Sequence, residues 1–308
     1  MNASASISPT AHYTGLVWAR HGLSHPALAT TTGHLLFWGF KPVVLAAQWA
    51  GVPAIDSFLL TRHRLIDLRL DEAIRSGRVG QVIEIASGLS ARGWRFNQRY
   101  GEALSYIEAD LPGMAQRKRE ALARMGGPQP GHRVVDIDAL AEGGPQSLDA
   151  VAASLDRNRG LALITEGLVN YFSEADVRSM WQRFSSLMRQ FPQASYWSDI
   201  ALLDDMGGRR VAPFVGFLSA FVRGRVHLHF RSPADAEAAL RECGFAGARA
   251  IDPGELADAL GDIPGGVSRR IRVIEATTTP GPVLSSSCLL YTSPSPRDLS
   301  TSRMPSSA

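Results

Sequence analysis

The chain of 308 residues contains little lysine and little cysteine, and both shortages narrow its possible functions. Its only lysines are Lys41 and Lys118, so almost all of its basic side chains are arginines. The formal net charge is +3, and no basic run is longer than Arg117-Lys118-Arg119, which does not favour a nucleic-acid-binding protein. The two cysteines, Cys243 and Cys288, cannot build a disulfide framework or a cysteine zinc site, and we predict no metal.

The sequence also lacks a long uninterrupted hydrophobic run. Residues 35–52 are broken by Lys41 and Pro42, and residues 213–222 are too few to span a bilayer. The first basic residue is Arg20, and no apolar core of signal-peptide type precedes it. We therefore expect a cytoplasmic protein that does not enter a membrane.

The last part of the chain differs in composition from the rest. Residues 285–308 are rich in serine and proline and have neither helical nor strand periodicity, which is typical of a disordered terminus. Within them, Cys288 to Asp298 resemble the translation of a transposase adapter used in sequencing libraries. We hypothesise that this segment is a read-through artefact and that the fold ends near residue 284.

The N-terminal part is expected to be helical. Asp56 is a candidate N-cap, and Leu59, Ile66 and Leu70 then recur on one helical face until Gly77 ends the helix. We therefore divide the chain into a helical segment 1–77, a main domain 78–284 and the tail 285–308.

The main domain alternates between strand and helix signals. Helices with serine caps are expected to start at Ser173 and at Ser232, the second ending at Gly244. Short apolar runs predict strands at 82–86, 104–108, 133–137, 161–165, 195–198, 248–251 and 271–274. This alternation predicts an α/β, mostly parallel, doubly wound sheet, which binds ligands beyond the carboxyl ends of its strands.

Glycine and acidic residues follow several of these strands. The first strand leads into Ala86-Ser87-Gly88, where a glycine would let the backbone approach a ligand closely. This is not a G-x-G-x-x-G motif, because Ala86 stands at one glycine place. Asp110 ends the second strand about 20 residues further on, where an acid typically accepts hydrogen bonds from ribose hydroxyls. A helix-start acid favoured by the helix dipole is the alternative for Asp110.

Two further acids stand at strand ends. Asp138 follows the third strand, and Glu166 follows the fourth, directly before Gly167. Each alone is commonly a cap or a solvated loop acid, whereas acids and glycine at four consecutive strand ends favour a shared ligand site. Such acids could face an adenine edge or a cationic centre.

Three segments carry a family resemblance. Residues Gly80–Ser90, Tyr106–Pro112 with Lys118 downstream, and Ile164–Tyr171 occur in order and with compatible spacing. They resemble the leucine carboxyl methyltransferase family, and more closely its bacterial branch of polyketide-type O-methyltransferases. The similarity runs from about residue 62 to 276, which is most of the chain.

The resemblance implies a class I methyltransferase that uses S-adenosyl-L-methionine. Its fold would be Rossmann-like, with a seven-stranded, mostly parallel sheet, one antiparallel strand, helices on both faces and an N-terminal helical extension. The family's cofactor contacts would fall on Glu84, Ala86 and Gly88 around the methionine part, Asp110 at the ribose, Asp138 and Ala139 at the adenine, Glu166 at the amino group and Arg62 at the carboxylate.

The implied reaction is methyl transfer to a carboxylate or hydroxyl oxygen of a small molecule, polyketide-like in that branch. A carboxylate acceptor needs orientation and no base, whereas a hydroxyl would benefit from one. The histidines are candidates for that base but are more often surface or capping residues, so we assign no catalytic residue: His21, His25, His227 and His229. The acceptor pocket is expected from the N-terminal helices and residues 203–224, whose Phe214, Phe217, Leu218 and Phe221 could equally pack in the core.

Two other functions remain open at this point. A nicotinamide-dependent oxidoreductase could use a related sheet, but the G-x-G-x-x-G motif is missing and neither lysine belongs to a Tyr-x-x-x-Lys pair. A non-catalytic homologue that only binds the cofactor would keep Gly88, Asp110 and Glu166. The identity of the acceptor and the oligomeric state are left undetermined.

Overall fold

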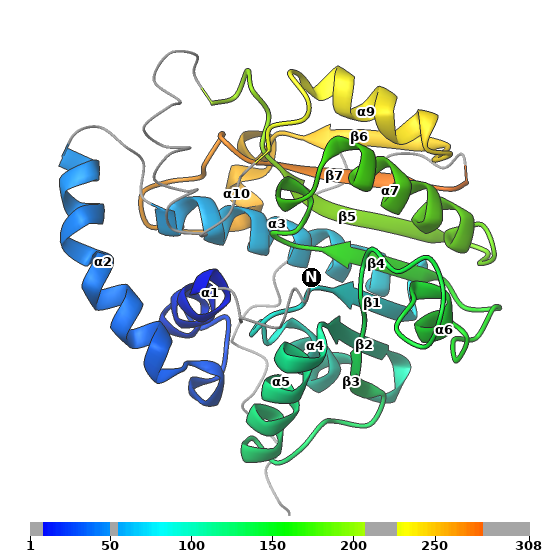
Figure 1. Ribbon diagram of the computed structural model, residues 1–308, viewed down its shortest axis with the longest axis horizontal. Coiled ribbons are helices and arrows are strands. Elements are labelled where there is room, and N and C mark those ends of the chain that lie inside the picture. Colours follow the sequence, from blue (N-terminus) through cyan, green and yellow to red (C-terminus); the bar gives the residue numbers. More distant parts are fainter. Residues whose placement is uncertain (1–8, 50–54, 207–226, 280–308) are drawn as a thin grey trace, which may run out of the picture.

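The computed structural model describes residues 9–49, 55–206 and 227–279. Three helices come first: α1 (Pro9–Arg20), α2 (Thr31–Trp49) and α3 (Ile55–Arg75), with the short 3-10 turn η1 (Pro26–Leu28) after α1. In Figure 1, α1 and α2 lie beyond the ends of the strands, whereas α3 runs behind the sheet. The expected N-terminal helical segment is therefore present in the described residues.

A single sheet of seven strands forms the centre. The strands are β1 (Gln81–Ile85), β2 (Ser105–Asp110), β3 (His132–Asp136), β4 (Leu161–Thr165), β5 (Ala194–Ile200), β6 (Gly247–Ile251) and β7 (Arg272–Thr277). Their order is β3-β2-β1-β4-β5-β7-β6, and β7 is antiparallel to both of its neighbours. The predicted mostly parallel sheet with one antiparallel strand is confirmed. The predicted bounds differ from the observed ones by at most three residues, the largest difference being at the end of β7, and those of β4 agree at both ends.

Helices cover both faces of this sheet. One face carries α3, α4 (Arg92–Tyr100) with the turn η2 (Gly101–Ala103), and α5 (Pro112–Arg124). The other carries α6 (Leu148–Ala152), α7 (Glu174–Met188) and α9 (Pro233–Glu242), which stand in front in Figure 1. Short turns complete the described elements: η3 (Val169–Tyr171), η5 (Pro253–Leu256) and α10 (Ala257–Leu260).

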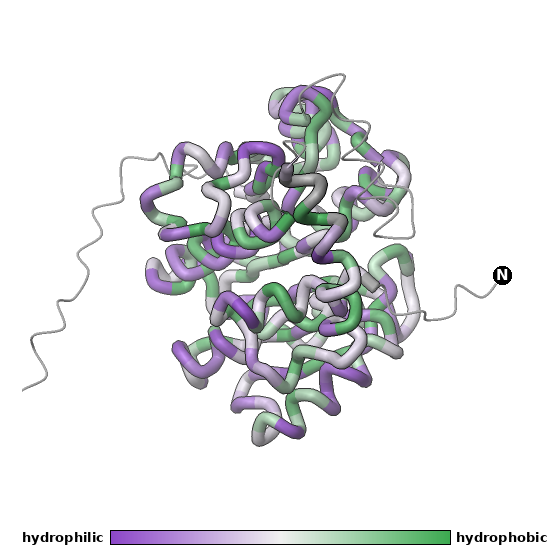
Figure 2. Tube along the Cα trace, turned by 90° about the vertical axis from the view of Figure 1, so that its left-hand side faces the viewer, coloured by the Kyte–Doolittle hydropathy of each residue, from purple (hydrophilic) through white to green (hydrophobic). Residues whose placement is uncertain are grey.

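The strands are apolar on both sides because both faces are covered. All residues of β1, β4 and β5 are buried, which is the pattern of strands between two helical layers. Ile83 and Ile85 point into the core with α7 and α9, whereas Val82 points into the core with α3. In Figure 2 the outer helices alternate between hydrophobic and hydrophilic segments, as expected of amphipathic helices.

Local sequence signals set several helix ends. Ser173 accepts a hydrogen bond from the Asp176 amide, and Ser232 forms a capping box with Asp235, so both predicted starts are confirmed. Asp56 differs from the prediction, because α3 already begins at Ile55 and Asp56 lies in its first turn. There its carboxylate accepts a hydrogen bond from Tyr13 of α1, at 3.3 Å, and so joins two helices instead of capping one.

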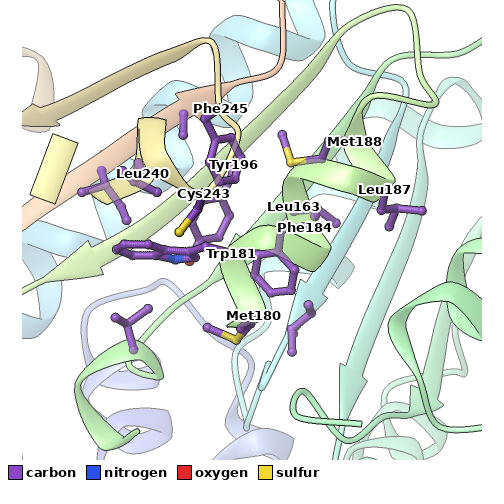
Figure 3. Close-up of a cluster of buried hydrophobic side chains, with 14 of the residues drawn as sticks. Leu163, Met180, Trp181, Phe184, Leu187, Met188, Tyr196, Leu240, Cys243 and Phe245 are labelled. Atoms are coloured by element: carbon purple, nitrogen blue, oxygen red, sulfur yellow. The ribbon is translucent and has the colours of Figure 1, made fainter. Parts of the chain in front are cut away.

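The core on the α7 side is built around aromatic side chains. Trp181 is fully buried, stacks on Phe230 with 5.7 Å between ring centroids, and donates a hydrogen bond to the Tyr196 hydroxyl. Figure 3 shows Trp181 and Tyr196 beside Cys243 and Phe245, which come from α9 and its C-terminal turn. Through these contacts α7 and the C-terminal end of α9 pack against β5.

Two expectations concern segments outside the described residues. The predicted artefact 285–308 lies beyond residue 279, and the aromatic part of segment 203–224 falls within 207–226. Among the helices of the described residues, none is both long enough and apolar enough to cross a bilayer.

Candidate functional site

The carboxyl ends of three neighbouring strands meet at one edge of the sheet. Ile85, the last residue of β1, pairs with Ala109 of β2 on one side and with Thr165 of β4 on the other. The turn after β1, Asp110 and Glu166 therefore start from adjacent positions. The chain order reverses between β1 and β4, and this switch point is where such sheets bind ligands.

Helix α1 covers the turn that follows β1. A Cβ placed on Gly88 would lie 3.8 Å from the Ala11 side chain, and one placed on Gly15 would lie 3.1 Å from Leu89. The N-terminal helix therefore packs directly on the turn and shields this part of the strand edge from solvent.

The turn itself has an unusual backbone. Ala86 has a φ of 56° and is the only non-glycine residue with a positive φ in the part of the chain that the structure describes. Gly88 has a φ of 52°, which glycine adopts without steric cost. Between them, the Ser87 hydroxyl is buried and has no hydrogen-bond partner within the described structure. A strained turn with an unused buried hydroxyl is typical of a ligand-binding position.

The backbone at Ala86 leads to a testable prediction. Ala86→Val is expected to lower the free energy of unfolding by roughly 1–3 kcal/mol, because a β-branched side chain is strongly disfavoured at positive φ. Ala86→Gly is expected to stay within about 1 kcal/mol of the parent, since glycine relieves the strain but costs chain entropy. Urea unfolding of both variants measures the difference, and equal stability of valine and glycine would contradict the strained turn.

Asp110 is fixed by backbone amides. Its Oδ2 accepts a hydrogen bond from the Gly88 amide at 2.7 Å, and its Oδ1 accepts one from the Leu111 amide at 2.8 Å. Burial raises the pKa of the Asp110 carboxyl, and these two hydrogen bonds oppose that rise. Asp110 therefore connects the end of β2 to the turn after β1, and its contact with a ribose stays a prediction.

Glu166 and Arg62 form a buried ion pair beside this turn. Arg62 of α3 donates from Nε to Glu166 at 3.2 Å and from Nη1 to Asp199 at the end of β5, at 2.9 Å. Asp199 also accepts a hydrogen bond from the Gly167 amide at 2.6 Å. Gly167 has a φ of 68°, and a Cβ there would lie 3.0 Å from the Arg62 guanidinium. The structure thus brings Arg62 and Glu166 together, and their contacts with a cofactor stay predictions.

Two more side chains, those of His63 and Arg92, contact Glu166. His63 Nδ1 lies 2.9 Å from Glu166 Oε2, and Arg92 Nη2 donates to the same oxygen at 2.6 Å. His63, Arg92 and Arg62 hold the pKa of Glu166 well below its usual range, despite the opposing effect of burial. Glu166 is therefore a carboxylate at neutral pH.

A second buried network, centred on Lys118 of α5, contacts the turn after β1. Lys118 of α5 donates to the Ser87 carbonyl oxygen at 3.2 Å and to Glu108 at 2.9 Å, while His132 contacts the other oxygen of Glu108 at 2.9 Å. These two partners lower the pKa of Glu108 to about 2 although it is buried. Lys118, which the sequence analysis noted only as part of the resemblance, thus connects β2 and α5 to the turn.

The other expected cofactor residues are placed differently. Glu84 is buried and points into the interior, where Arg92 donates to one oxygen at 2.5 Å and Tyr106 to the other at 2.7 Å. Burial raises the pKa of Glu84. Asp138 is exposed after β3 and accepts a hydrogen bond from the Leu140 amide, and the Ala139 carbonyl accepts one from Arg183. Their contacts with an adenine stay predictions, as does the part assigned to Glu84.

The four histidines considered as bases divide into two groups. His25 caps η1 by accepting from the Ala27 amide, which is the structural role that the sequence also allowed. His227 and His229 stack on each other next to η3, where the His227 backbone bonds to Asn170. Within the described residues, no hydrogen bond from His21 to the strand-end acids is present. A catalytic base therefore stays unassigned.

A groove of about 860 Å³ lies elsewhere, between α3, α4 and the η5–α10 segment. Its walls include Asp67, Arg95, Phe96 and Leu260. The residues expected to bind the cofactor do not line it. The groove and the strand-end site are therefore separate, although Asp67 also contacts Arg92.

Sequence analysis missed His63, Asp67, Arg92 and Asp199. Asp199 did leave a signal, because it is an acid near the end of a strand, like Asp110. The other three lie on helices, and no local pattern indicates that α3 and α4 turn those side chains toward the same carboxylate.

The sequence profile described as leucine carboxyl methyltransferase matches residues 34–185, which include the turn after β1, Asp110 and Glu166. These residues, just under half of the chain, match the leucine carboxyl methyltransferase family. A Mycobacteroides abscessus protein named "Putative S-adenosyl-L-methionine-dependent methyltransferase" is 32% identical over 137 residues, 44% of this chain and 42% of that protein. A Mycobacterium marinum protein of the same name is 32% identical over 150 residues, 48% of this chain and 44% of that protein.

The aligned regions span less than half of the length of these curated relatives. The structural likeness covers more of the chain than the sequence likeness does. A DUF574 family protein of Streptomyces avermitilis, solved as a crystal structure, is 13% identical and covers 88% of this chain and 97% of that protein, with a TM-score of 0.53. This likeness concerns the fold alone, which is the predicted Rossmann-like class I methyltransferase fold.

Proposed function

We propose that this protein is a methyltransferase that uses S-adenosyl-L-methionine. The observation that carries the proposal is the hydrogen bond from the Gly88 amide to Asp110, with Glu166 on the adjacent strand end, in a chain whose residues 34–185 match this family. That pair offers one acid for ribose hydroxyls and one for an ammonium group at the same edge. The names of the mycobacterial relatives support the same cofactor.

The residues at the strand ends fit the chemistry of this cofactor. A carboxylate has about four lone-pair sites, and the two backbone amides use two of those of Asp110, so the others can accept ribose hydroxyls. The buried, unpartnered Ser87 hydroxyl can bond to the methionine part. Glu166 carries the negative charge for the ammonium group, Arg62 can bind the carboxylate, and Asp138 and Ala139 can face the adenine.

The bound cofactor would supply a methyl group on a sulfonium centre, and the protein's part is to bind and align. Asp110 would hold the adenosine end relative to the turn, while Ser87, Glu166 and Arg62 would hold the amino-acid end. Helix α1 lies over the turn and excludes water from it. The acceptor must then approach from the side that these contacts leave open.

The finer part of the proposal concerns the acceptor. We infer transfer to an oxygen, either carboxylate or hydroxyl, of a small molecule, in line with the polyketide-type branch that the sequence resembles. A carboxylate is already nucleophilic at neutral pH and needs only orientation, whereas a hydroxyl would benefit from a base, for which His227 and His229 beside η3 are candidates.

A thermal-shift panel tests the cofactor class. S-adenosylhomocysteine is expected to raise the melting temperature, because a ligand that binds only the folded state stabilises it, whereas NAD and NADP should not. No shift at millimolar S-adenosylhomocysteine would contradict the proposal, and a shift with NAD alone would favour the oxidoreductase. Incubation of cell extract with isotope-labelled cofactor, with the product identified by mass spectrometry, then tests turnover and identifies the acceptor.

Asp110 gives a quantitative prediction for this site. Asp110→Ala is expected to weaken S-adenosylhomocysteine binding by roughly 1–3 kcal/mol, the range for buried partners that are left unpaired. Wild-type binding should also weaken as the pH falls, beginning above the ordinary aspartate pKa of about 3.9, because burial raises the pKa of Asp110 and the protonated form accepts hydrogen bonds poorly. Calorimetry between neutral and acidic pH measures both effects, and unchanged affinity in Asp110→Ala would refute the ribose assignment.

A further inference from the structure

Arg92 has an unusual position for an arginine. Its side chain is completely buried in the first turn of α4, four residues after Gly88. It donates from Nε to Asp67 at 2.5 Å, from Nη1 to Glu84 at 2.5 Å and from Nη2 to Glu166 at 2.6 Å. One guanidinium therefore pairs with three carboxylates.

These three carboxylates come from different parts of the fold. Asp67 belongs to α3, Glu84 to β1, and Glu166 to the segment after β4. Only a planar fork with donors in fixed directions can reach all three at once, and a lysine ammonium at the same place would be a single compact charge. Arg92 thus determines where the Glu166 carboxylate lies relative to α3 and β1.

The contacts of Glu166 divide between its two oxygens. Oε2 is held by Arg92 and by His63, and Oε1 is held by Arg62. The side chain of Glu166 is still 5% exposed, whereas that of Arg92 is 0% exposed. Arg92 is therefore closed off from a ligand itself, and Glu166 is the partner through which it can act on one at the strand ends.

We propose that Arg92 is a positioning residue, which fixes the Glu166 carboxylate so that it meets the ammonium group of the bound cofactor. This inference rests on the proposed function, because it needs a cofactor with an amino-acid part at the strand ends. It makes Arg92 specific for one half of the ligand: the adenosine half, held at Asp110, does not depend on it.

The test compares two ligands on variants of the full chain. 5′-Methylthioadenosine contains the adenosine and sulfur of S-adenosylhomocysteine but lacks the amino-acid part. In Arg92→Lys, the dissociation constant of S-adenosylhomocysteine is expected to rise at least about tenfold, which corresponds to about 1.4 kcal/mol. The dissociation constant of 5′-methylthioadenosine should change less than about twofold. Titration calorimetry measures both.

Arg69→Lys is the matched control. Arg69 of α3 is also a buried arginine. It donates one hydrogen bond to Glu72, at 2.8 Å, and one to Glu275 of β7, at 2.5 Å. Arg69→Lys likewise removes a buried guanidinium that pairs with two carboxylates, but at a place away from the strand-end turn. It is expected to lower the melting temperature as Arg92→Lys does and to leave both dissociation constants unchanged.

A second variant keeps the proposal testable if Arg92→Lys does not fold. Arg92→Met combined with Asp67→Asn removes the guanidinium together with the Asp67 carboxylate that it would leave unpaired, and Glu84 keeps its hydrogen bond from Tyr106. Glu166 keeps Arg62 and His63 in this variant. The selective loss of S-adenosylhomocysteine affinity is expected again, whereas Asp67→Asn alone, which retains Arg92, should bind both ligands nearly as the parent does.

The outcomes separate this inference from the proposed function. If the parent protein does not bind S-adenosylhomocysteine, the proposed function fails. If the parent binds it and a folded Arg92 variant binds it equally well, only the positioning role fails. Equal weakening of both ligands would mean that Arg92 supports the whole turn and would likewise overturn the positioning role.

Discussion

Glu166→Ala is expected to lower the free energy of unfolding by about 3–5 kcal/mol, the range for removing one partner of a buried ion pair. The reason is that Arg62, His63 and Arg92 all converge on this carboxylate, which is 5% exposed. Without it, two buried guanidinium groups lose a counter-charge. The variant should also lose detectable S-adenosylhomocysteine binding, because no other acid takes its place at the proposed ammonium contact.

Urea unfolding at pH 7 with and without ligand measures both effects. Glu174→Ala is the matched control, since Glu174 pairs with Arg178 on the surface at 47% exposure and should change stability by no more than about 0.5 kcal/mol. The effect should depend on pH. The pKa of Glu166 is lowered in the folded state, so its stabilisation is complete above the ordinary glutamate pKa of about 4.3 and is lost as the pH falls below it. Equal stability of Glu166→Ala and the parent at pH 7 would disprove the convergence of charges.

The second large effect is expected in the hydrophobic core. Trp181→Ala should lower the free energy of unfolding by about 3–5 kcal/mol, because it leaves a cavity between α7 and β5 that the surrounding core can fill only partly. The change removes the ring that stacks on Phe230 and the donor to the Tyr196 hydroxyl. The neighbours seen in Figure 3, among them Cys243 and Phe245, would lose contacts as well.

Denaturant unfolding with unchanged slope would attribute the loss to the native core. Gln182→Ala, at the exposed next position of the same helix, should stay within about 0.5 kcal/mol and so controls for helix propensity. A loss below about 1 kcal/mol in Trp181→Ala would mean that this cluster does not hold α7 on the sheet.

Local patterns predicted most of the sheet because each strand is a short run with several apolar residues, bounded by turns. Leu161–Thr165 matches the prediction at both ends, and the capped helices start where Ser173 and Ser232 indicate. Asp56 shows the limit of such signals. A carboxylate can cap a helix or bond across to another, and its bond to Tyr13 of α1 depends on packing that the local sequence does not encode.

The candidate site, like the fold, was predicted from the sequence only in part. Asp110 and Glu166 were predicted because strand ends of a parallel sheet share one edge, so a position along the strand is enough to place them. Arg92 and His63 were not predicted, because each depends on how a helix is rotated and seated against the sheet. Lys118 shows the difference, since one of the two lysines of the chain is buried beneath the turn and not exposed to solvent.

The sequence by itself determined the order of strands and helices, the acids and glycines at the strand ends and the family resemblance, because these depend on residue periodicity and on short motifs. The tertiary structure alone decided which charges meet. The pKa of Glu166 is low, and the Arg92 guanidinium can be fully buried, only because α3, α4, β1 and the segment after β4 converge. Burial magnifies both the cost of an unpaired charge and the value of a paired one, and burial is a property of the packed chain.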